Sequence, residues 1–123
     1  MKNLYVGLMS GTSRDSLDGC LVSFENGLNI LACETLNFSD GYQTSQDQAY
    51  IDREITNKSI ELVHKLIKTR RENVAAIAFP GQTISHNDKF SLQAGSPETI
   101  AKETRIPVYS DFRNFDISKG GKG

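Results

Sequence analysis

The sequence lacks the features that mark membrane-spanning and nucleic-acid-binding chains. No apolar run approaches the about 20 residues that a membrane span needs, and the N-terminus has no signal-peptide pattern. Fourteen basic residues are balanced by fifteen acidic ones, which leaves a net charge of −1 and no basic stripe. We therefore predict a cytoplasmic protein whose partners include neither nucleic acid nor a membrane.

Cysteine is scarce as well. Cys20 and Cys33 have neither CxxC spacing nor histidines at ligand spacing, which argues against a metal site built on them. They lie on two strand-like runs joined by Asn26-Gly27, a pair typical of a type I′ hairpin turn. If these two residues form the whole loop, Cys20 lies opposite Cys33 as a non-hydrogen-bonded pair, with Cα atoms about 4.5 Å apart. The pair is either a redox-sensing disulfide or two small apolar residues that stay reduced in a cytoplasm, and we favour reduced thiols.

The hydrophobic pattern predicts an α/β chain. Apolar runs typical of strands occupy residues 4–9, 17–24, 28–38, 74–79, 90–93 and 107–109. Apolar residues at three- and four-residue steps predict a helix within 49–70, and Ser96-Pro97 predicts the start of a second helix. Three antiparallel strands followed by strands reached through helices predict a mixed β-sheet with flanking helices. We interpret residues 1–113 as one partial domain and 114–123 as a glycine-rich tail, too polar to pack alone and part of a cleft.

Familiar phosphate-binding and nucleophile motifs are absent. There is no GxxxxGK[ST], no GxGxxG between a strand and a helix, and no GxSxG. These absences argue against a P-loop, a dinucleotide-binding turn and a hydrolase nucleophile elbow. The strongest remaining candidate is the stretch 7–18, GLMSGTSRDSLD, which places glycines, hydroxyls and carboxylates in a turn between two strands.

This turn has the composition of an anion site. Backbone N–H groups around Gly11 can converge on an anion, and the Thr12 and Ser13 hydroxyls can donate to phosphate oxygens. Asp15 and Asp18 would repel phosphate, so we expect them to hold Mg²⁺ or its waters, or to bond a hydroxyl. The alternative is an ordinary polar turn stabilised by its own Asp and Ser side chains.

Four blocks of the sequence resemble the anhydro-N-acetylmuramic acid kinase family. MSGTSRDSLDG resembles the family signature MSGTSxDGxD. In the order of the chain, residues 80–84 with His86 resemble HGQTxxH, residues 92–95 resemble LQxG, and residues 111–123 resemble DFRxxD…GGQGAPL. The blocks keep the family order and extend over the chain from end to end.

The resemblance implies a ribonuclease H-like, actin-like ATPase fold, of which this chain would form an incomplete half-domain. It also implies the cofactors ATP and Mg²⁺, and an amino sugar as the second small-molecule partner. The family cleaves the 1,6-anhydro bond of anhydro-N-acetylmuramic acid and phosphorylates the 6-oxygen, giving N-acetylmuramic acid 6-phosphate for cell-wall recycling.

Site residues follow from the resemblance position by position. The ATP-phosphate segment corresponds to Gly11, Thr12, Ser13, Arg14, Asp15, Ser16, Leu17 and Asp18. Substrate binding corresponds to Gln82, Asp111 and Arg113, and Arg113 would also support catalysis by neutralising charge on the transferring phosphoryl group. The chain departs from the family pattern at Arg14 (usually apolar), Ser16 (glycine, so the backbone is less free), Pro80 (histidine) and Lys122 (glutamine).

The family is considerably longer than this chain, and its catalytic aspartate follows the last block. We therefore expect an N-terminal fragment of such a kinase, inactive by itself. The alternative is a standalone, non-catalytic module that binds a nucleotide or an amino sugar. An exposed half-cleft also favours self-association or the docking of the missing C-terminal domain.

Overall fold

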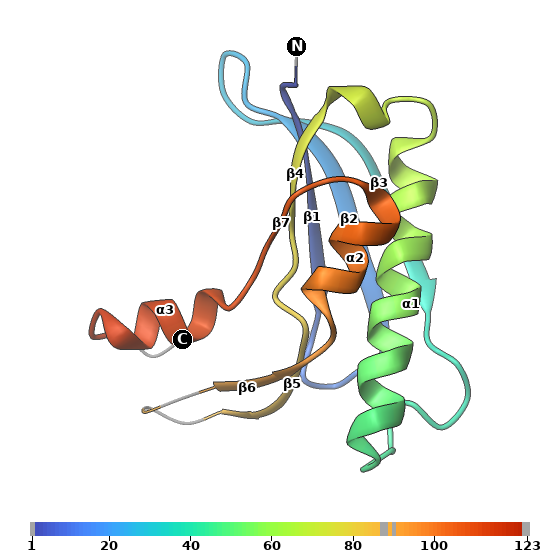
Figure 1. Ribbon diagram of the computed structural model, residues 1–123, viewed down its shortest axis with the longest axis vertical. Coiled ribbons are helices and arrows are strands. Elements are labelled where there is room, and N and C mark those ends of the chain that lie inside the picture. Colours follow the sequence, from blue (N-terminus) through green and yellow to red (C-terminus); the bar gives the residue numbers. More distant parts are fainter. Residues whose placement is uncertain (1, 87–88, 90, 122–123) are drawn as a thin grey trace.

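The computed structural model describes residues 2–86, 89 and 91–121 and has a five-stranded sheet in the order β3-β2-β1-β4-β7 (Figure 1). Its strands are β1 (Leu4–Ser10), β2 (Ser16–Ser23), β3 (Asn29–Asn37), β4 (Val74–Ala78) and β7 (Val108–Tyr109). The antiparallel hairpin of β5 (Gln82–His86) and β6 (Ser91–Ala94) forms a separate small sheet. The helices are α1 (Gln48–Ile67), the 3-10 turn η1 (Arg71–Asn73), α2 (Pro97–Thr104) and α3 (Phe112–Ser118).

The large sheet is mixed, as predicted. β2 runs antiparallel to β1 and β3, whereas β1, β4 and β7 run parallel to one another. Helices α1 and α2 lie on the same face of this sheet (Figure 1). The predicted α/β class, with a mixed sheet and flanking helices, is confirmed.

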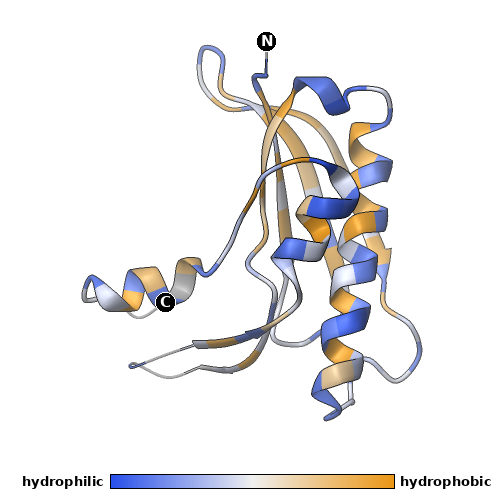
Figure 2. Cartoon of the chain, viewed as in Figure 1, coloured by the Kyte–Doolittle hydropathy of each residue, from blue (hydrophilic) through white to orange (hydrophobic). Residues whose placement is uncertain are grey.

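Burial along β1 shows why the sheet has one covered face. Leu4, Val6 and Leu8 are buried, whereas Tyr5 and Met9 at the alternating positions are exposed. Side chains alternate between the two faces of a strand, so the buried set belongs to the face that packs against the helices. Figure 2 shows the matching pattern on α1, where hydrophobic and hydrophilic residues alternate along the helix.

Local sequence signals fix the starts of both covering helices. The Asp47 side chain caps α1 by accepting bonds from the amides of Ala49 and Tyr50. The Ser96 side chain caps α2 by accepting from the amide of Thr99, with Pro97 in the first turn, as predicted.

The β2–β3 hairpin follows the predicted register only in part. Cys20 pairs with Cys33 as predicted, but the register shifts by one residue between Leu21 and Val22. The strands therefore end at Ser23 and resume at Asn29, and the predicted two-residue loop is wrong. Asn26 and Gly27 do have positive φ angles, 58° and 100°, as the central residues of a type I′ turn require.

Cys20 and Cys33 form a disulfide in the structure, so the predicted pair of reduced thiols is wrong. The pairing register places their Cα atoms 4.2 Å apart. Both side chains lie on the face of the sheet that the helices do not cover. The disulfide joins β2 to β3 in the middle of the hairpin.

The C-terminal segment contains a helix that was not predicted. α3 occupies Phe112–Ser118, so it begins before the predicted boundary at 113 and extends into the stretch 114–123 that was expected to be a tail too polar to pack alone. These seven residues include neither glycine nor proline, which are confined to the chain before and after them. The position of the domain boundary at 113 stays a prediction.

The second face of the large sheet has no helical cover in the described part of the chain. A groove of about 480 Å³ lies on it, lined by Tyr5, Ala76, Ala78, Tyr109 and Phe112 among others. Tyr109 is 61% exposed and Phe112 is 43% exposed.

Among the residues placed by the structure, no helix has the length and apolar character needed to cross a membrane.

Candidate functional site

The segments singled out by the sequence meet at one edge of the large sheet. β1, β4 and β7 are parallel, so their carboxyl ends lie at the same edge, the lower one in Figure 1. The turn 11–15 follows β1, residues 79–82 follow β4, and residues 110–111 follow β7. In open α/β sheets, ligands bind at the carboxyl ends of parallel strands.

The turn after β1 presents polar groups to solvent. Gly11, Thr12 and Ser13 are exposed, and the Arg14 amide donates to the Gly11 carbonyl at 3.1 Å. Arg14 has a positive φ of 58°, a conformation that non-glycine residues seldom adopt. Within the described residues, the amides of Thr12 and Ser13 have no protein acceptor, so both N–H groups can serve an anion.

The Arg14 side chain contacts the loop before α1 instead of projecting over the turn. Its Nη1 donates to the carbonyls of Tyr42 (3.2 Å) and Ser45 (2.7 Å). The guanidinium also lies 5.7 Å from the centre of the Tyr42 ring. Arg14 therefore attaches the turn to residues 42–45. A direct contact between this cation and a nucleotide stays a prediction.

The two carboxylates of the turn lie in different surroundings. Asp15 accepts from the Ser13 hydroxyl at 2.9 Å and from Gln43 Nε2 at 2.7 Å. Asp18 lies on the uncovered face of β2 and accepts from the Thr35 hydroxyl at 2.6 Å. Both are exposed acceptors of neutral donors, and so each keeps lone pairs for a cation or its waters.

Ser16 and Leu17 already belong to β2. Ser16 pairs with Asn37 and is not among the residues with positive φ. Serine at the position of the family's glycine therefore does not have to adopt a left-handed backbone conformation. Leu17 is 1% exposed and belongs to the core. Only its main chain could face a ligand.

Gln82 lies directly beneath the turn. It is fully buried, and its Nε2 donates to the Gly11 carbonyl at 3.0 Å. Its Oε1 accepts from the hydroxyls of Ser10 (2.5 Å) and Tyr42 (3.0 Å). The assignment of Gln82 to substrate binding stays a prediction.

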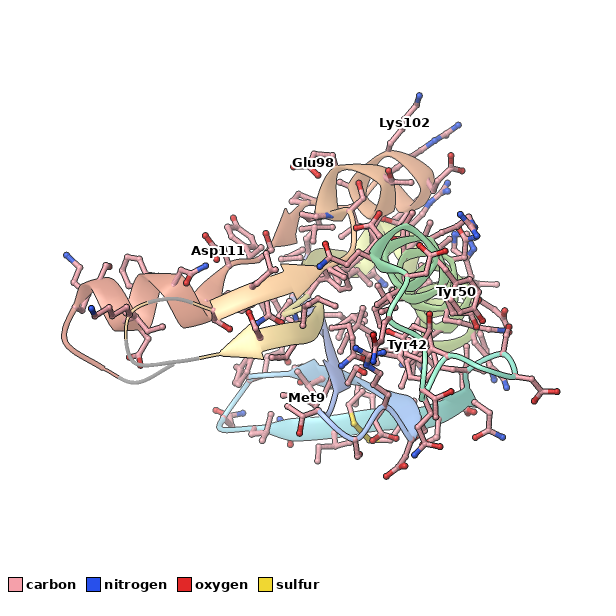
Figure 3. All side chains as sticks on the ribbon, turned by 90° about the horizontal axis from the view of Figure 1, so that it is seen from below. Met9, Tyr42, Tyr50, Glu98, Lys102 and Asp111 are labelled. Carbon is pink, nitrogen blue, oxygen red and sulfur yellow. A yellow bond between two sulfur atoms is a disulfide. The ribbon has the colours of Figure 1, made fainter. Side chains whose placement is uncertain are left out.

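Tyr42 completes this buried cluster. Its ring stacks on Phe38 with centroids 4.0 Å apart, and its side chain is fully buried (Figure 3). Burial raises the pKa of the Tyr42 phenol above its ordinary value, and the neighbouring Arg14 charge opposes this only in part. The phenol is therefore a neutral hydrogen-bond donor at any physiological pH.

The second half of the site surrounds Asp111. A pocket of about 240 Å³ is lined by Pro80, Gln93, Gly95, Asp111 and Asn114 among others. Asp111 is exposed, has a positive φ of 60°, and accepts from Asn114 Nδ2 at 2.7 Å. Asn114 also exchanges two hydrogen bonds with the main chain of Ser91, at 2.7 and 2.8 Å, which attaches α3 to β6.

Glycines shape the wall of this pocket. Gly81 has a φ of 80°, and a Cβ there would lie 2.6 Å from the Ala94 carbonyl oxygen. Gly95 has a φ of 117°, and a Cβ there would overlap the Phe79 ring. The side chains of Arg113 and His86, and all of Lys122, fall outside the part that the structure describes, so the roles predicted for them stay predictions.

Sequence reasoning missed Tyr42, Gln43 and Asn114. Tyr42 and Gln43 lie between the predicted strand 28–38 and the predicted helix within 49–70, where no role was assigned, and Asn114 was assigned to the tail. A bulky aromatic residue inside a polar loop was the one available signal, because such a ring usually packs against something. The described residues contain no group of three or more His, Cys, Asp or Glu side chains that could hold a metal ion.

The fold and the site define the class: a mixed α/β domain with a turn of glycine and hydroxyl residues at the carboxyl edge of its parallel strands. The family model "Anhydro-N-acetylmuramic acid kinase" matches residues 3–123, and the chain belongs to that family.

Two similar relatives carry that name. The protein of Shewanella pealeana is 36% identical over 141 residues, and that of Shewanella baltica (strain OS185) is 38% identical over 144 residues. The alignments cover 98% and 100% of this chain, which spans only 38% and 39% of the length of these curated relatives. Among solved structures, Thermus thermophilus RuvC is similar over 87% of this chain and 62% of its own, with a TM-score of 0.44 and 18% identity.

Proposed function

We propose that this chain forms the nucleotide-phosphate side of the cleft of an ATP-dependent sugar kinase with an actin-like fold. The whole protein would cleave 1,6-anhydro-N-acetylmuramic acid and phosphorylate it to N-acetylmuramic acid 6-phosphate, in cytoplasmic recycling of peptidoglycan. The observation that carries this proposal is the turn after β1, which offers the Thr12 and Ser13 amides and hydroxyls at the edge where β4 and β7 also end.

The residues present fit a magnesium nucleotide. The amides and hydroxyls of Thr12 and Ser13 would bind phosphate oxygens, and Asp15 and Asp18 would hold Mg²⁺ or its waters. Bound ATP supplies the phosphoryl group. Across the site, Asp111 would bind the amino sugar, and Arg113 would neutralise charge on the transferring phosphoryl.

The proposal predicts that residues 1–123 bind the nucleotide but do not catalyse phosphoryl transfer. The catalytic aspartate that the resemblance implies has no counterpart in the four matching blocks. We therefore expect residues 1–123 to bind MgATP without releasing ADP when the anhydro sugar is added. Sugar-dependent ADP release in a coupled assay would contradict that expectation.

Calorimetric titration with MgATP tests the binding step. The Ser13 hydroxyl donates to Asp15 at 2.9 Å in the structure and would turn to a phosphate oxygen when the nucleotide binds. Ser13→Ala removes this donor, and we expect affinity to fall roughly tenfold, as for one charge-assisted hydrogen bond. Ser118→Ala is the matched control, because among the residues that the structure describes the Ser118 hydroxyl bonds only to the Phe115 carbonyl of its own helix. An absence of binding at millimolar MgATP, or an equal loss in both variants, would contradict the proposed nucleotide site.

The uncovered face of the sheet supports a further part of the proposal, that this chain associates with itself or with another domain. Tyr109 and Phe112 are exposed beside the groove of about 480 Å³. Sedimentation velocity over a concentration series should show association that Tyr109→Glu reduces. A concentration-independent monomer would contradict it.

A further inference from the structure

The amide of Gln82 uses its polar groups entirely inside the protein. The side chain is fully buried, its nitrogen donates to the Gly11 carbonyl at 3.0 Å, and its oxygen accepts from Ser10 and Tyr42. No ligand on the surface can reach this amide without displacing the turn above it.

The bond to Gly11 determines the direction of the next amide. The Gly11 carbonyl and the Thr12 N–H belong to one peptide group, and the described part of the chain has no cis peptide bond. In a trans peptide the C=O and N–H point in opposite directions. With the carbonyl turned inward to Gln82, the Thr12 N–H points outward, toward the exposed side of the turn.

Local sterics restrict this peptide only in part. Its rotation changes ψ of Gly11, which has no Cβ to limit it, and φ of Thr12, whose branched side chain disfavours positive values. The Gly11 carbonyl accepts two bonds, one from Gln82 Nε2 and one from the Arg14 amide at 3.1 Å. The Arg14 bond lies within the turn, whereas the Gln82 bond ties the turn to β5.

Ser10 and Tyr42 determine which end of the Gln82 amide meets Gly11. Both hydroxyls donate to Oε1, at 2.5 and 3.0 Å, which leaves the nitrogen facing the Gly11 carbonyl. Rotating the amide by half a turn would set two carbonyl oxygens against each other in a buried site, which is unfavourable. Tyr42 remains a neutral donor because its hydroxyl is buried.

We propose that Gln82 is a positioning residue that fixes the Gly11–Thr12 peptide with its N–H toward the bound phosphate, and that Tyr42 and Ser10 keep Gln82 in that orientation. This inference rests on the proposed nucleotide function for its ligand. It requires no contact between Gln82 and the ligand.

Tyr42→Phe tests the proposal with little change in volume. It removes the hydroxyl donor to Gln82 and keeps the ring stacked on Phe38. The matched control is Tyr50→Phe, which removes a hydroxyl that bonds at 3.4 Å to the Asp40 carbonyl and not to Gln82. We expect the Thr12 amide signal to shift in the ligand-free Tyr42 variant, and the MgATP dissociation constant to rise roughly 2- to 10-fold.

A purely structural role would lower the melting temperature and leave the Thr12 amide signal and the nucleotide affinity unchanged, which would overturn the proposal. The two proposals can fail separately. If wild-type protein does not bind MgATP, the proposed function fails, while the Thr12 amide in the free variants still decides this inference.

Gln82→Glu supplies a second test. Burial favours the neutral acid, which can donate to the Gly11 carbonyl as the amide does, whereas the carboxylate cannot. We expect the Thr12 amide of this variant to match wild type at acidic pH and to depart from it as pH rises. A variant whose Thr12 signal follows that of wild type at every pH would overturn the proposal. If this variant fails to fold, Ser10→Ala takes its place, with the same Thr12 readout.

Discussion

The two halves of the candidate site are held in different ways. The turn after β1 is bonded to the fully buried side chain of Gln82, to which the buried Tyr42 hydroxyl donates, and to the loop before α1 through Arg14. The segment around Asp111 belongs to a short helix on the outside of the molecule, attached to β6 through Asn114. In Figure 3, Tyr42 lies inside the molecule beside α1, whereas Asp111 lies near the start of α3.

This difference suggests a division of labour. The half of the site that is held by core side chains keeps its geometry without a ligand, because changing it would disrupt the packing of those side chains. The half fixed by a few exposed bonds can adjust when a ligand or another domain arrives. We therefore expect changes to the two halves to differ in magnitude and in how far their effects extend.

The largest effect should come from removing the ring that supports the turn. Tyr42→Ala should lower the free energy of unfolding by about 3–5 kcal/mol, because it empties a fully buried aromatic site. Tyr50→Ala, at a half-buried position on α1, should cost about 1 kcal/mol. Urea unfolding measures both, and equal costs would remove the distinction between a core-supported turn and its surroundings.

A smaller effect is expected where the pocket wall turns from β6 to α2. Gly95→Ala should cost about 2–4 kcal/mol, because it adds a Cβ at a φ of 117° that overlaps the Phe79 ring. Gly27→Ala is the matched control, with a φ of 100° and open space around it. The control should cost about 1–2 kcal/mol, so the excess reports the contact itself. Equal costs in thermal unfolding would mean that the wall is not tightly packed.

Asn114→Ala should cost about 1–2 kcal/mol, since it leaves the amide and carbonyl of nearly buried Ser91 without their partner. Its effect should be local: hydrogen exchange should accelerate in α3 and leave α1 unchanged. Ser118→Ala on the same helix should stay within about 0.5 kcal/mol of wild type. Global loss of protection in the Asn114 variant would show that the second half belongs to the core after all.

The smallest effect is confined to alkaline solution. The pKa of Tyr42 is raised in the folded state, so the unfolded chain releases this proton first as pH rises past about 10. Below that pH the stabilisation is complete, and above it stability should fall by up to about 1.4 kcal/mol per pH unit for this one proton. Urea unfolding at several alkaline pH values should show a steeper loss in wild type than in Tyr42→Phe. If the free energy of unfolding falls equally with pH in both proteins, the Tyr42 phenol is exposed to solvent and the account of its burial is wrong.

The order of the elements could be predicted because its signals are local. The spacing of Ile55, Val63 and Leu66 marks α1, and Ser96 with Pro97 marks the start of α2, with no need to know what lies opposite. The parallel strands then determine which segments share an edge. That is why the segments expected to form a site converge.

What could not be predicted depends on contacts between distant residues. Nothing near Tyr42 in the sequence shows that its hydroxyl meets Gln82, which lies 40 residues further along the chain. The register shift after Leu21 requires the paired strands, and the attachment of α3 through Asn114 requires β6. The motif matches marked the residues of the turn but not the side chains that hold it.

The most direct test of the account is a titration of the chain with MgATP, followed by ¹⁵N–¹H spectra of its backbone amides. We predict that the amide signals of Thr12 and Ser13 shift saturably, that the Gln82 amide shifts less, and that the amide of Cys33, on the uncovered face of the sheet, does not shift. Shifts that saturate elsewhere while Thr12 and Ser13 stay unmoved would contradict the claim that the turn after β1 is a nucleotide-phosphate site.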